Sequence, residues 1–189
     1  MIAHDKQVYD FTFSTTPEIF ASVGGDGSVR LFDLRNLEHS TILYETADTT
    51  PLLRVAWNAL DPHFLLTFGS ASNRLTLLDT RLPSIPVAEL VGPTGLLNDL
   101  TWAPHSAAHC AATSDDGRVY VWNLLADSST QTTTPQLGGT STTLNANSCT
   151  VLPHFSYSIG EPVQQMCWPV SHPDWMAVSA GKSIQWIRI

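Results

Sequence analysis

Hydrophobic and polar residues alternate in short segments along this chain of 189 residues, and the spacing of an amphipathic helix is absent. Four segments share one pattern, in which an apolar residue is followed by two others, an apolar residue, one other and an aromatic ring. They are VYDFTF (8–13), LLRVAW (52–57), LNDLTW (97–102) and VQQMCW (163–168). A second set follows them in turn: VRLFD (29–33), LTLLD (75–79), VYVWN (119–123) and IQWIR (184–188). Such alternation predicts β-strands.

Both sets of segments recur at nearly the same interval. The aromatic residues that close the first set, Phe13, Trp57, Trp102 and Trp168, are 44, 45 and 66 residues apart. The fourth positions of the second set, Phe32, Leu78, Trp122 and Ile187, are 46, 44 and 65 residues apart. A repeat of about 40–45 residues with four short strands is typical of a β-propeller blade. Between the second and third predicted strands lie turn sequences such as GGDG (24–27) and DDG (115–117), which suit tight hairpins.

We therefore predict an all-β chain in which residues 1–189 form consecutive blades of one propeller. The predicted blades cover about residues 4–46, 50–92, 95–160 and 161–189. The outer strand of the third blade is expected within VLPHFSYS (151–158), and the fourth blade lacks its outer strand. Four tryptophans take strand positions that should face the packed interior: Trp57, Trp102, Trp122 and Trp168.

The third repeat contains an insert, residues 127–150, of which about half is Ser and Thr. Because it has almost no large apolar residues, it cannot offset the entropy lost on ordering. We expect a disordered surface loop. The alternative is a phosphorylated regulatory loop, with Thr134-Pro135 as one candidate site.

Charge and cysteine content exclude several classes of protein. The net charge is −8, with only nine Lys and Arg residues, whereas nucleic-acid binding depends on neutralising phosphates. No apolar run approaches the roughly 18 residues of a membrane helix, and the start MIAHDKQVYD lacks the pattern of a secretory signal. Cys110, Cys149 and Cys167 have no paired spacing, which fits free thiols in a reducing compartment. We expect neither direct nucleic-acid binding nor membrane insertion.

The sequence contains no recognisable catalytic constellation. His105 and His109 have a spacing that suits zinc on a helix, but here they span a turn and the start of a strand, where their side chains do not converge. No nucleophile elbow and no glycine-rich phosphate loop is found. We therefore expect no catalytic, cofactor-binding or metal site. The alternative of a propeller-based enzyme requires acids, bases or metal ligands that converge around the channel.

Several segments resemble known proteins. GSVRLFD and GRVYVWN, each with an Asp-Gly turn, are similar to WD repeats. IAHDKQVYDF, FASVGGDGSVRLFDLRNLEHSTILYE, WAPHSAAH and PDWMAV resemble one WD-repeat family. It contains the plant scaffold transparent testa glabra, its anthocyanin-regulating relatives and an animal cullin-associated substrate-receptor factor. The resemblance covers nearly the whole chain except about residues 126–150.

The resemblance implies a seven-bladed propeller, of which this chain supplies about four blades from the C-terminal part. The alternative is a closed ring of four blades. WD repeats often hold a buried His–Ser/Thr–Asp–Trp hydrogen-bond tetrad. The first blade offers His4, Ser22 and Asp26, with Phe32 in place of the Trp, and the third offers Asp116 and Trp122, with Ala112 at the Ser/Thr position. We expect Asp26 to cap its turn and to reach His4.

Two acid–base pairs, Asp33/Arg35 and Asp79/Arg81, lie just past the third strands of the first two blades. They resemble the Asp-x-Arg box by which WD-repeat receptors engage the adaptor of cullin-four ubiquitin ligases, although Phe32 and Leu78 replace the Trp that precedes the family's Asp. These four residues are our candidate partner-binding site, since a guanidinium can present a planar fork to carboxylates or carbonyls. The alternative is that Arg35 and Arg81 pair within the blade and brace the next linker.

The family resemblance implies a non-catalytic scaffold in cytoplasm and nucleus. Its partners would be a ubiquitin-ligase adaptor, protein kinases or transcription regulators, and no cofactor is expected. The alternatives are the propeller-based enzyme and a non-functional fragment of a longer propeller.

Overall fold

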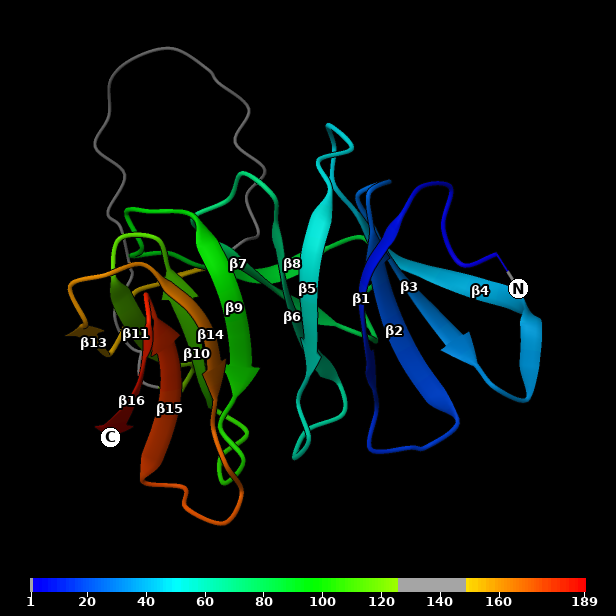
Figure 1. Cartoon of the computed structure of the whole chain (residues 1–189). Helices are drawn as coiled ribbons and strands as arrows, with labels where there is room; N and C mark the ends of the chain where they lie inside the picture. The colour runs from blue at the N-terminus through cyan, green and yellow to red at the C-terminus, as the bar shows by residue number, and fades with distance from the viewer. Residues whose placement is uncertain (1, 126–148) are drawn as a thin grey trace, which may run out of the picture.

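The computed structural model describes residues 2–125 and 149–189, and the regular structure in this part of the chain consists of β-strands alone. The strands form four sheets that follow one another along the chain (Figure 1), and we call these sheets blades 1 to 4. The first strands of the blades are neighbours in chain order. The prediction of an all-β, partial propeller is therefore confirmed. Within the described residues, no helix has the length and apolar character to cross a membrane.

Blades 1 and 2 contain the first eight strands. Blade 1 is β1 (Val8–Phe13), β2 (Ile19–Gly24), β3 (Ser28–Asp33) and β4 (Asn36–Glu45). Blade 2 is β5 (Leu52–Trp57), β6 (Phe64–Gly69), β7 (Leu75–Asp79) and β8 (Pro86–Leu90). In both blades each strand pairs antiparallel with the next. The turn between β2 and β3 places Gly27 at a φ of 79°, a left-handed conformation that glycine adopts without steric cost.

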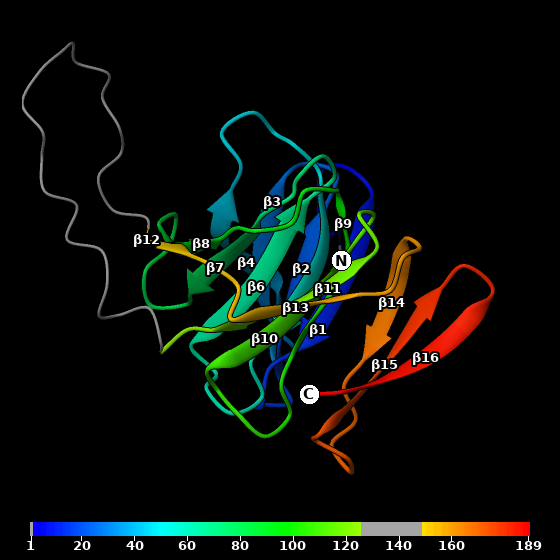
Figure 2. The same ribbon diagram turned by 90° about the vertical axis from the view of Figure 1, so that its left-hand side faces the viewer.

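Blades 3 and 4 contain the remaining strands, except for one that joins blade 2. Blade 3 is β9 (Leu97–Trp102), β10 (His109–Ser114), β11 (Arg118–Asn123) and β13 (Phe155–Ser158). Blade 4 is β14 (Val163–Cys167), β15 (Trp175–Ala180) and β16 (Ser183–Arg188). Figure 2 shows blade 4 at one side of the molecule. Among the described residues blade 4 has three strands, in agreement with the prediction that it lacks its outer strand.

Strand β12 (Cys149–Val151) is a difference from the sequence prediction. It pairs in parallel with β8 and becomes a fifth strand on the outer edge of blade 2 (Figure 2). The segment VLPHFSYS is thus divided, because Val151 is buried at the edge of blade 2 while Phe155–Ser158 completes blade 3. Cys149 and Thr150, the end of the expected disordered insert, lie in β12. The remainder of that expectation, with the candidate site Thr134-Pro135, lies outside the described residues.

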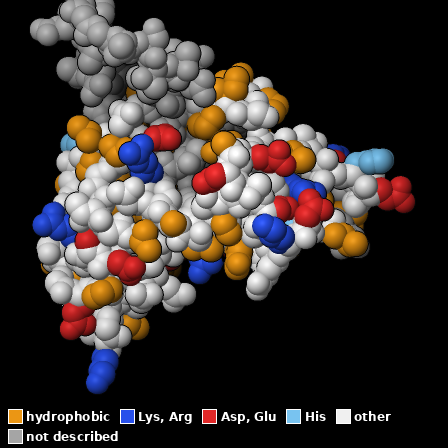
Figure 3. All heavy atoms as spheres, turned by 90° about the horizontal axis from the view of Figure 1, so that it is seen from above, with side chains coloured by type: hydrophobic (Ala, Val, Ile, Leu, Met, Phe, Trp, Pro, Cys, Tyr) orange, Lys and Arg blue, Asp and Glu red, His pale blue; other side chains and the backbone are white. Residues whose placement is uncertain are grey.

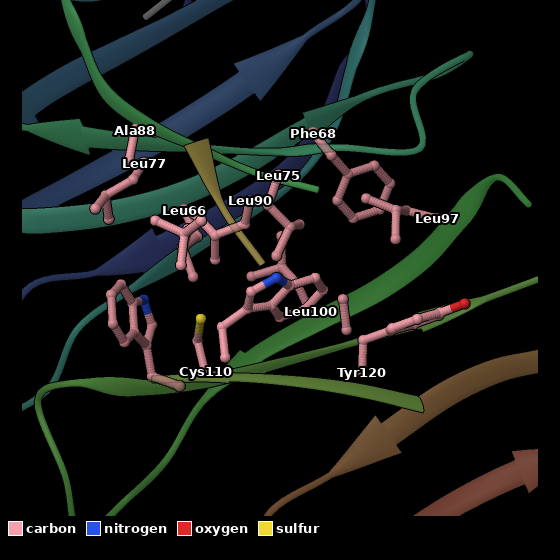
Figure 4. Packing of buried hydrophobic residues seen from close by; sticks show 14 residues of the cluster. Leu66, Phe68, Leu75, Leu77, Ala88, Leu90, Leu97, Leu100, Cys110 and Tyr120 are labelled. Atoms are coloured by element: carbon pink, nitrogen blue, oxygen red, sulfur yellow. The ribbon is translucent and has the colours of Figure 1, made fainter. Parts of the chain in front are cut away.

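Each pair of neighbouring blades encloses its own hydrophobic cluster. The cluster between blades 2 and 3 includes Leu66 and Phe68 from one side and Leu97 and Leu100 from the other, and their side chains point toward one another (Figure 4). Similar clusters lie between blades 1 and 2 and between blades 3 and 4. The main driving force for folding is therefore the burial of apolar area between blades.

The four tryptophans predicted to face the interior are all buried, as expected: Trp57, Trp102, Trp122 and Trp168. Their indole N–H groups have two kinds of acceptor. Trp57 and Trp168 donate within their own blades, to the carbonyls of Pro62 and Pro173. Trp102 and Trp122 donate across the blade interface, to Ala56 O (3.0 Å) and Val91 O (3.1 Å) of the preceding repeat. The second pair connects blade 3 to blade 2 as well as filling the core.

Two carboxylates on the first strands also connect neighbouring blades. Asp10 Oδ2 accepts a hydrogen bond from Val55 N–H (3.0 Å), and Asp99 Oδ2 accepts one from Met166 N–H (2.9 Å). Burial raises the pKa of Asp99, although the N–H groups of Met166 and Leu100 favour its ionised form. Asp10 and Asp99 occupy the same position in their repeats, so the chain uses one device to join blade 1 to blade 2 and blade 3 to blade 4.

The closed four-bladed ring is not the arrangement observed. Blades 1 and 4 lie at opposite ends of the row (Figure 1). Phe11 and Phe13 on blade 1, and Ile184 and Trp186 on blade 4, are exposed. The described blades therefore form an open arc.

We expect Asp10→Ala to lower the free energy of unfolding by about 1–2 kcal/mol, because Val55 N–H loses its acceptor at a partly buried interface. Asp10→Asn keeps an acceptor oxygen and should cost less than half as much. Urea denaturation of both variants and of the wild-type chain measures the difference. Equal losses in the two variants would contradict the assigned contact.

We expect Thr113→Val to stabilise the protein. Thr113 is fully buried, and its hydroxyl has no hydrogen-bond partner among the described residues. The equivalent residue of blade 1, Val23, is apolar. Removing a buried, unpaired hydroxyl should raise the free energy of unfolding by about 1 kcal/mol in the same urea experiment. A destabilised variant would mean that the hydroxyl has a partner.

Candidate partner-binding rim

The candidate rim is built from two turns of the same construction. Asp33 ends β3 and Asp79 ends β7, which are the third strands of consecutive blades. In each turn the aspartate Oδ1 accepts a hydrogen bond from the backbone N–H two residues later, at 2.9 Å from Arg35 N and 2.9 Å from Arg81 N. Aspartate favours this local ring, which mimics a backbone turn. Both turns therefore lie at the same rim of the blades.

The two guanidinium groups face their own aspartates side-on. Arg35 Nε donates to Asp33 Oδ1 (2.8 Å) and Nη2 donates to Oδ2 (2.6 Å). Arg81 makes the same pair of bonds to Asp79, at 2.9 Å and 2.7 Å. This is the bidentate geometry of a charge-assisted pair. Among the described residues, neither guanidinium donates a hydrogen bond to the following linker, so the structure shows pairing within the blade but no brace.

These contacts hold both residues of each pair ionised. The hydrogen bonds from the Arg35 side chain and backbone lower the pKa of Asp33 to about 2, against a small opposing effect of burial. The hydrogen bond from the Arg81 side chain lowers the pKa of Asp79. In return, each carboxylate raises the pKa of its arginine, and Glu18 and Asp61 add to this effect at Arg35 and Arg81 respectively.

The arginines project to solvent while the aspartates differ in burial. The side chains of Arg35 and Arg81 are 68% and 58% exposed, whereas Asp79 is buried and Asp33 is about one-third exposed. The exposed Asp33–Arg35 pair contributes little stability, because solvent screens its charges. Arg81 is therefore accessible although its partner is not.

Blade 3 shows what the turn requires. Asn123 ends β11 at the position of Asp33 and Asp79, and its Oδ1 accepts a hydrogen bond from Leu125 N–H at 3.0 Å. The same turn thus forms with Asn in place of Asp and Leu in place of Arg. It follows that Arg35 and Arg81 are not needed for the turn itself.

A second polar cluster, in blade 1, confirms the prediction for Asp26. His4 Nδ1 donates to Asp26 Oδ1 (2.9 Å), and His4 Nε2 pairs with the hydroxyl of Ser22 (2.7 Å). Asp26 also accepts from the N–H and hydroxyl of Ser28, which caps the turn. The histidine side chain is fully buried, so the cluster fixes the entry to blade 1.

Sequence reasoning missed Arg30 in this cluster. Its Nη2 donates to Asp26 Oδ2 (3.2 Å) and to Asp5 Oδ2 (2.8 Å), and its Nε donates to Ser28 Oγ. The signal was the position of Arg30 on β3, two residues from Ser28 on the same face of the strand. Arg30 adds a positive charge to the cluster, while Phe32 in the tryptophan position stacks on Phe20 instead.

Blade 3 has no histidine at the tetrad position, and other groups hydrogen-bond to its turn aspartate instead. Asp116 Oδ2 accepts from the N–H and hydroxyl of Thr94, from Gly95 N–H and from the hydroxyl of Tyr120. A side chain at residue 95 would meet the backbone N of Asp116 at 2.6 Å, so only glycine fits this close approach. The turn of blade 3 is thus capped without histidine, by groups that the repeat pattern did not identify.

The remaining candidates for chemistry take part in local contacts. His109 pairs with Ser106 Oγ (2.7 Å), and the His105 ring packs edge-on against Trp168. Burial lowers the pKa of His109, and so do the nearby rings of His105 and His154. No cluster of three His, Cys, Asp or Glu side chains suited to a metal ion occurs in residues 2–125 and 149–189. Figure 3 shows acidic and basic side chains interspersed on the face seen from above.

Comparison with known proteins places these features in context. The family profile described as "WD domain, G-beta repeat" matches residues 1–33 and 84–123. The chain is 40% identical over 189 residues to the "DDB1- and CUL4-associated factor 7 homolog" of Dictyostelium discoideum, covering all of this chain and 52% of that protein.

More distant relatives show the same partial coverage. A WD repeat-containing protein of Saccharomyces cerevisiae is 32% identical over 240 residues, with 46% of its length covered. Human Nucleoporin Nup43 is 28% identical over 148 residues, with 77% of this chain and 38% of that protein covered. The chain spans about half the length of the first two relatives.

We expect stability to fall in acid partly because of Asp26. Burial opposes its ionisation, but the hydrogen bonds from Ser28, Asp5 and His4 outweigh burial and lower its pKa from 3.8 to about 2. Because the pKa of this carboxyl is lower in the folded state than in the unfolded state, its ionised form stabilises the fold at pH values above about 4. This stabilisation is lost as the pH falls from about 4 toward 2. The loss due to Asp26 should be about 1–2 kcal/mol.

The variant Asp26→Asn isolates this contribution. It should be less stable than the wild-type chain at neutral pH, and the difference should shrink between about pH 4 and pH 2, because the wild-type carboxylate is then protonated. Urea denaturation at several pH values measures it. A difference independent of pH would show that the charge of Asp26 does not stabilise the turn.

Proposed function

Because this chain is a WD40-repeat protein, we propose that it acts as a non-catalytic scaffold that binds other proteins through the rims of its blades. Paired strands hold the intervening turns in fixed positions, and a rigid framework of this kind is suited to displaying binding residues on loops. The proposed binding residues are Asp33, Arg35, Asp79 and Arg81.

We propose further that the rim engages the adaptor of a cullin-RING ubiquitin ligase, so that the protein presents substrates to it. The printed name of the Dictyostelium relative associates that protein with DDB1 and CUL4. DDB1 is accordingly the partner to test first. Kinases and transcription regulators are further proposed partners, and cytoplasm and nucleus are the proposed locations.

The observation that supports the proposal best is that the arginines are not needed to form the turns in which they lie. Blade 3 forms the same turn with Leu125 in the place of Arg35 and Arg81. A long charged side chain held in one orientation on an exposed rim loses entropy for little gain in stability. A role in binding a partner explains why two consecutive blades have an arginine at this position.

The surroundings of the first pair favour a docked protein. A shallow hollow of about 330 Å³ lies beside Asp33 and is lined by residues of β2, β3 and β4, among them Ile19, Phe32 and His39. An interface commonly combines an apolar recess with an arginine at its edge. A partner that fills the hollow would bring its own carboxylates or carbonyls within reach of Arg35.

Arg35 and Arg81 can contact a partner protein without giving up all of their hydrogen bonds to Asp33 and Asp79. Asp33 and Asp79 already occupy the Nε and Nη2 edge of each guanidinium. The flat faces of the guanidinium groups can still stack on aromatic rings or peptide planes. The aspartates then act as positioning residues that fix the orientation of each arginine.

We expect the double variant Arg35→Ala/Arg81→Ala to bind DDB1 at least about thirtyfold more weakly, since losing a charge-assisted contact at an interface costs about 2 kcal/mol or more. Loss of Arg35 should change the midpoint of thermal unfolding little, because that pair is exposed, whereas loss of Arg81 leaves the buried Asp79 without its ion partner and should lower the midpoint. Binding is therefore compared at a temperature at which both proteins are folded. Surface plasmon resonance and differential scanning calorimetry provide the two measurements.

Arg74→Ala is the matched control. Arg74 is also 58% exposed and also pairs with an acid of its own blade, Glu89, at 2.9 Å, but it lies outside the two turns. Its replacement should leave DDB1 binding unchanged. Unchanged binding by the folded double variant, or an equal loss in Arg74→Ala, would show that the rim is not the site.

A further inference from the structure

A recess of about 240 Å³ lies at the seam between blades 3 and 4, and we call it the histidine recess. Three of the side chains that line it are His105, His109 and His154. His109, at the start of β10, is equivalent to Ile19, which lines the hollow beside Asp33 in blade 1. The histidine recess therefore lies on the same rim as the two arginine turns, at the other end of the row of blades.

The three imidazole rings come from separate segments of blade 3. His105 lies in the loop between β9 and β10, His109 begins β10, and His154 immediately precedes β13. The chain has seven histidines, so almost half of them line this one recess. An imidazole can be protonated near neutral pH. The recess is thus a place where positive charge can gather in a chain whose net charge is −8.

Aromatic contacts hold two of these rings in place. The His105 ring packs edge-on against Trp168 of blade 4, with ring centroids 5.6 Å apart, and the His154 ring packs edge-on against Phe155 at 5.9 Å. The backbone of His154 is fixed as well, because its N–H donates to Val121 O at 2.8 Å. The recess therefore combines an apolar wall with a few polar groups, which is the usual composition of a small binding site.

We propose that the histidine recess binds a carboxylate side chain, Asp or Glu, from an acidic segment of a partner protein. Imidazole N–H groups donate to the carboxylate oxygens, and these hydrogen bonds are charge-assisted when a ring is protonated. Because His109 pairs with Ser106 Oγ through Nδ1, its Nε2 is the nitrogen that serves the ligand. The proposal does not depend on the function proposed for the arginine turns.

Binding of a carboxylate is coupled to the uptake of protons. Burial and the rings of His105 and His154 lower the pKa of His109, and a negatively charged ligand opposes these effects. The bound state therefore holds more protons than the free state, and the affinity rises as the pH falls from about 7.5 toward 5.5. Asp174 has the one carboxylate side chain among the residues that line the recess. Its charge favours protonated rings but repels a bound carboxylate.

Nuclear magnetic resonance of the histidine ring C–H groups tests the proposal on the full chain. The probe is a peptide of six glutamates, and a peptide of six glutamines is its uncharged control. Saturating hexaglutamate should raise the titration midpoints of His105, His109 and His154 by about half a pH unit or more. His172 should not shift, because it is exposed in the same loop as Asp174 but does not line the recess. Hexaglutamine should have no effect.

Three variants examine the same binding at pH 5.5, where the recess histidines are largely protonated. His105→Gln/His154→Gln should bind hexaglutamate at least about fivefold more weakly, since it loses two charge-assisted donors. Both side chains belong to exposed residues, and circular dichroism checks that the strands remain. Asp174→Asn should bind about twofold more tightly, because a repulsive charge is removed. His172→Gln is the matched control and should bind like the wild-type chain.

Several results would overturn the proposal. They are an equal shift at His172, an equal effect of hexaglutamine, an affinity that does not change with pH, and wild-type affinity in the folded double histidine variant. DDB1 binding takes no part in these measurements, so their failure is distinct from failure of the proposed rim function.

Discussion

Neighbouring blades of this protein meet through apolar faces, and each blade covers the apolar face of the next. This constraint organises the rest of the structure. Three hydrophobic clusters lie between the four blades, and polar contacts reinforce the seams: the Trp102 indole crosses to Ala56, and Asp10 and Asp99 accept N–H groups from the next blade. Because the strands are fixed in this way, the turns that connect them at the rim are also held in place.

The fixed strands explain why small polar turns can serve as binding elements. Asp33, Asp79 and Asn123 all close the same local ring at the end of a third strand. Because the ring needs only a side-chain oxygen, the residue two positions later can vary without loss of the turn. In blades 1 and 2 the residue at this position is arginine. In blade 3 it is leucine. The blades therefore differ here in surface chemistry and not in backbone geometry.

Periodicity in the sequence was enough to predict the strands, the propeller architecture and the burial of the four tryptophans. The contact between His4 and Asp26 also followed from the repeat, because both residues occupy fixed positions in it. The parallel addition of β12 to blade 2 did not follow, since its three residues follow a polar insert and pair with a different repeat. The ligands of Asp116 were missed for a related reason: Thr94 and Tyr120 perform a task that the repeat pattern assigns to histidine. The orientation of Arg35 and Arg81 toward their own aspartates depends on side-chain rotamers, which no pattern specifies.

The central claim is that two surplus arginines on one rim contact a partner protein. A cryo-electron microscopy structure of the chain bound to DDB1 tests it most directly. The account predicts that the turns at residues 33–35 and 79–81 lie in the interface, with both guanidinium groups against DDB1 atoms, and that the turn at residues 123–125 need not take part. A complex in which both arginines face solvent, still paired only with Asp33 and Asp79, would contradict it.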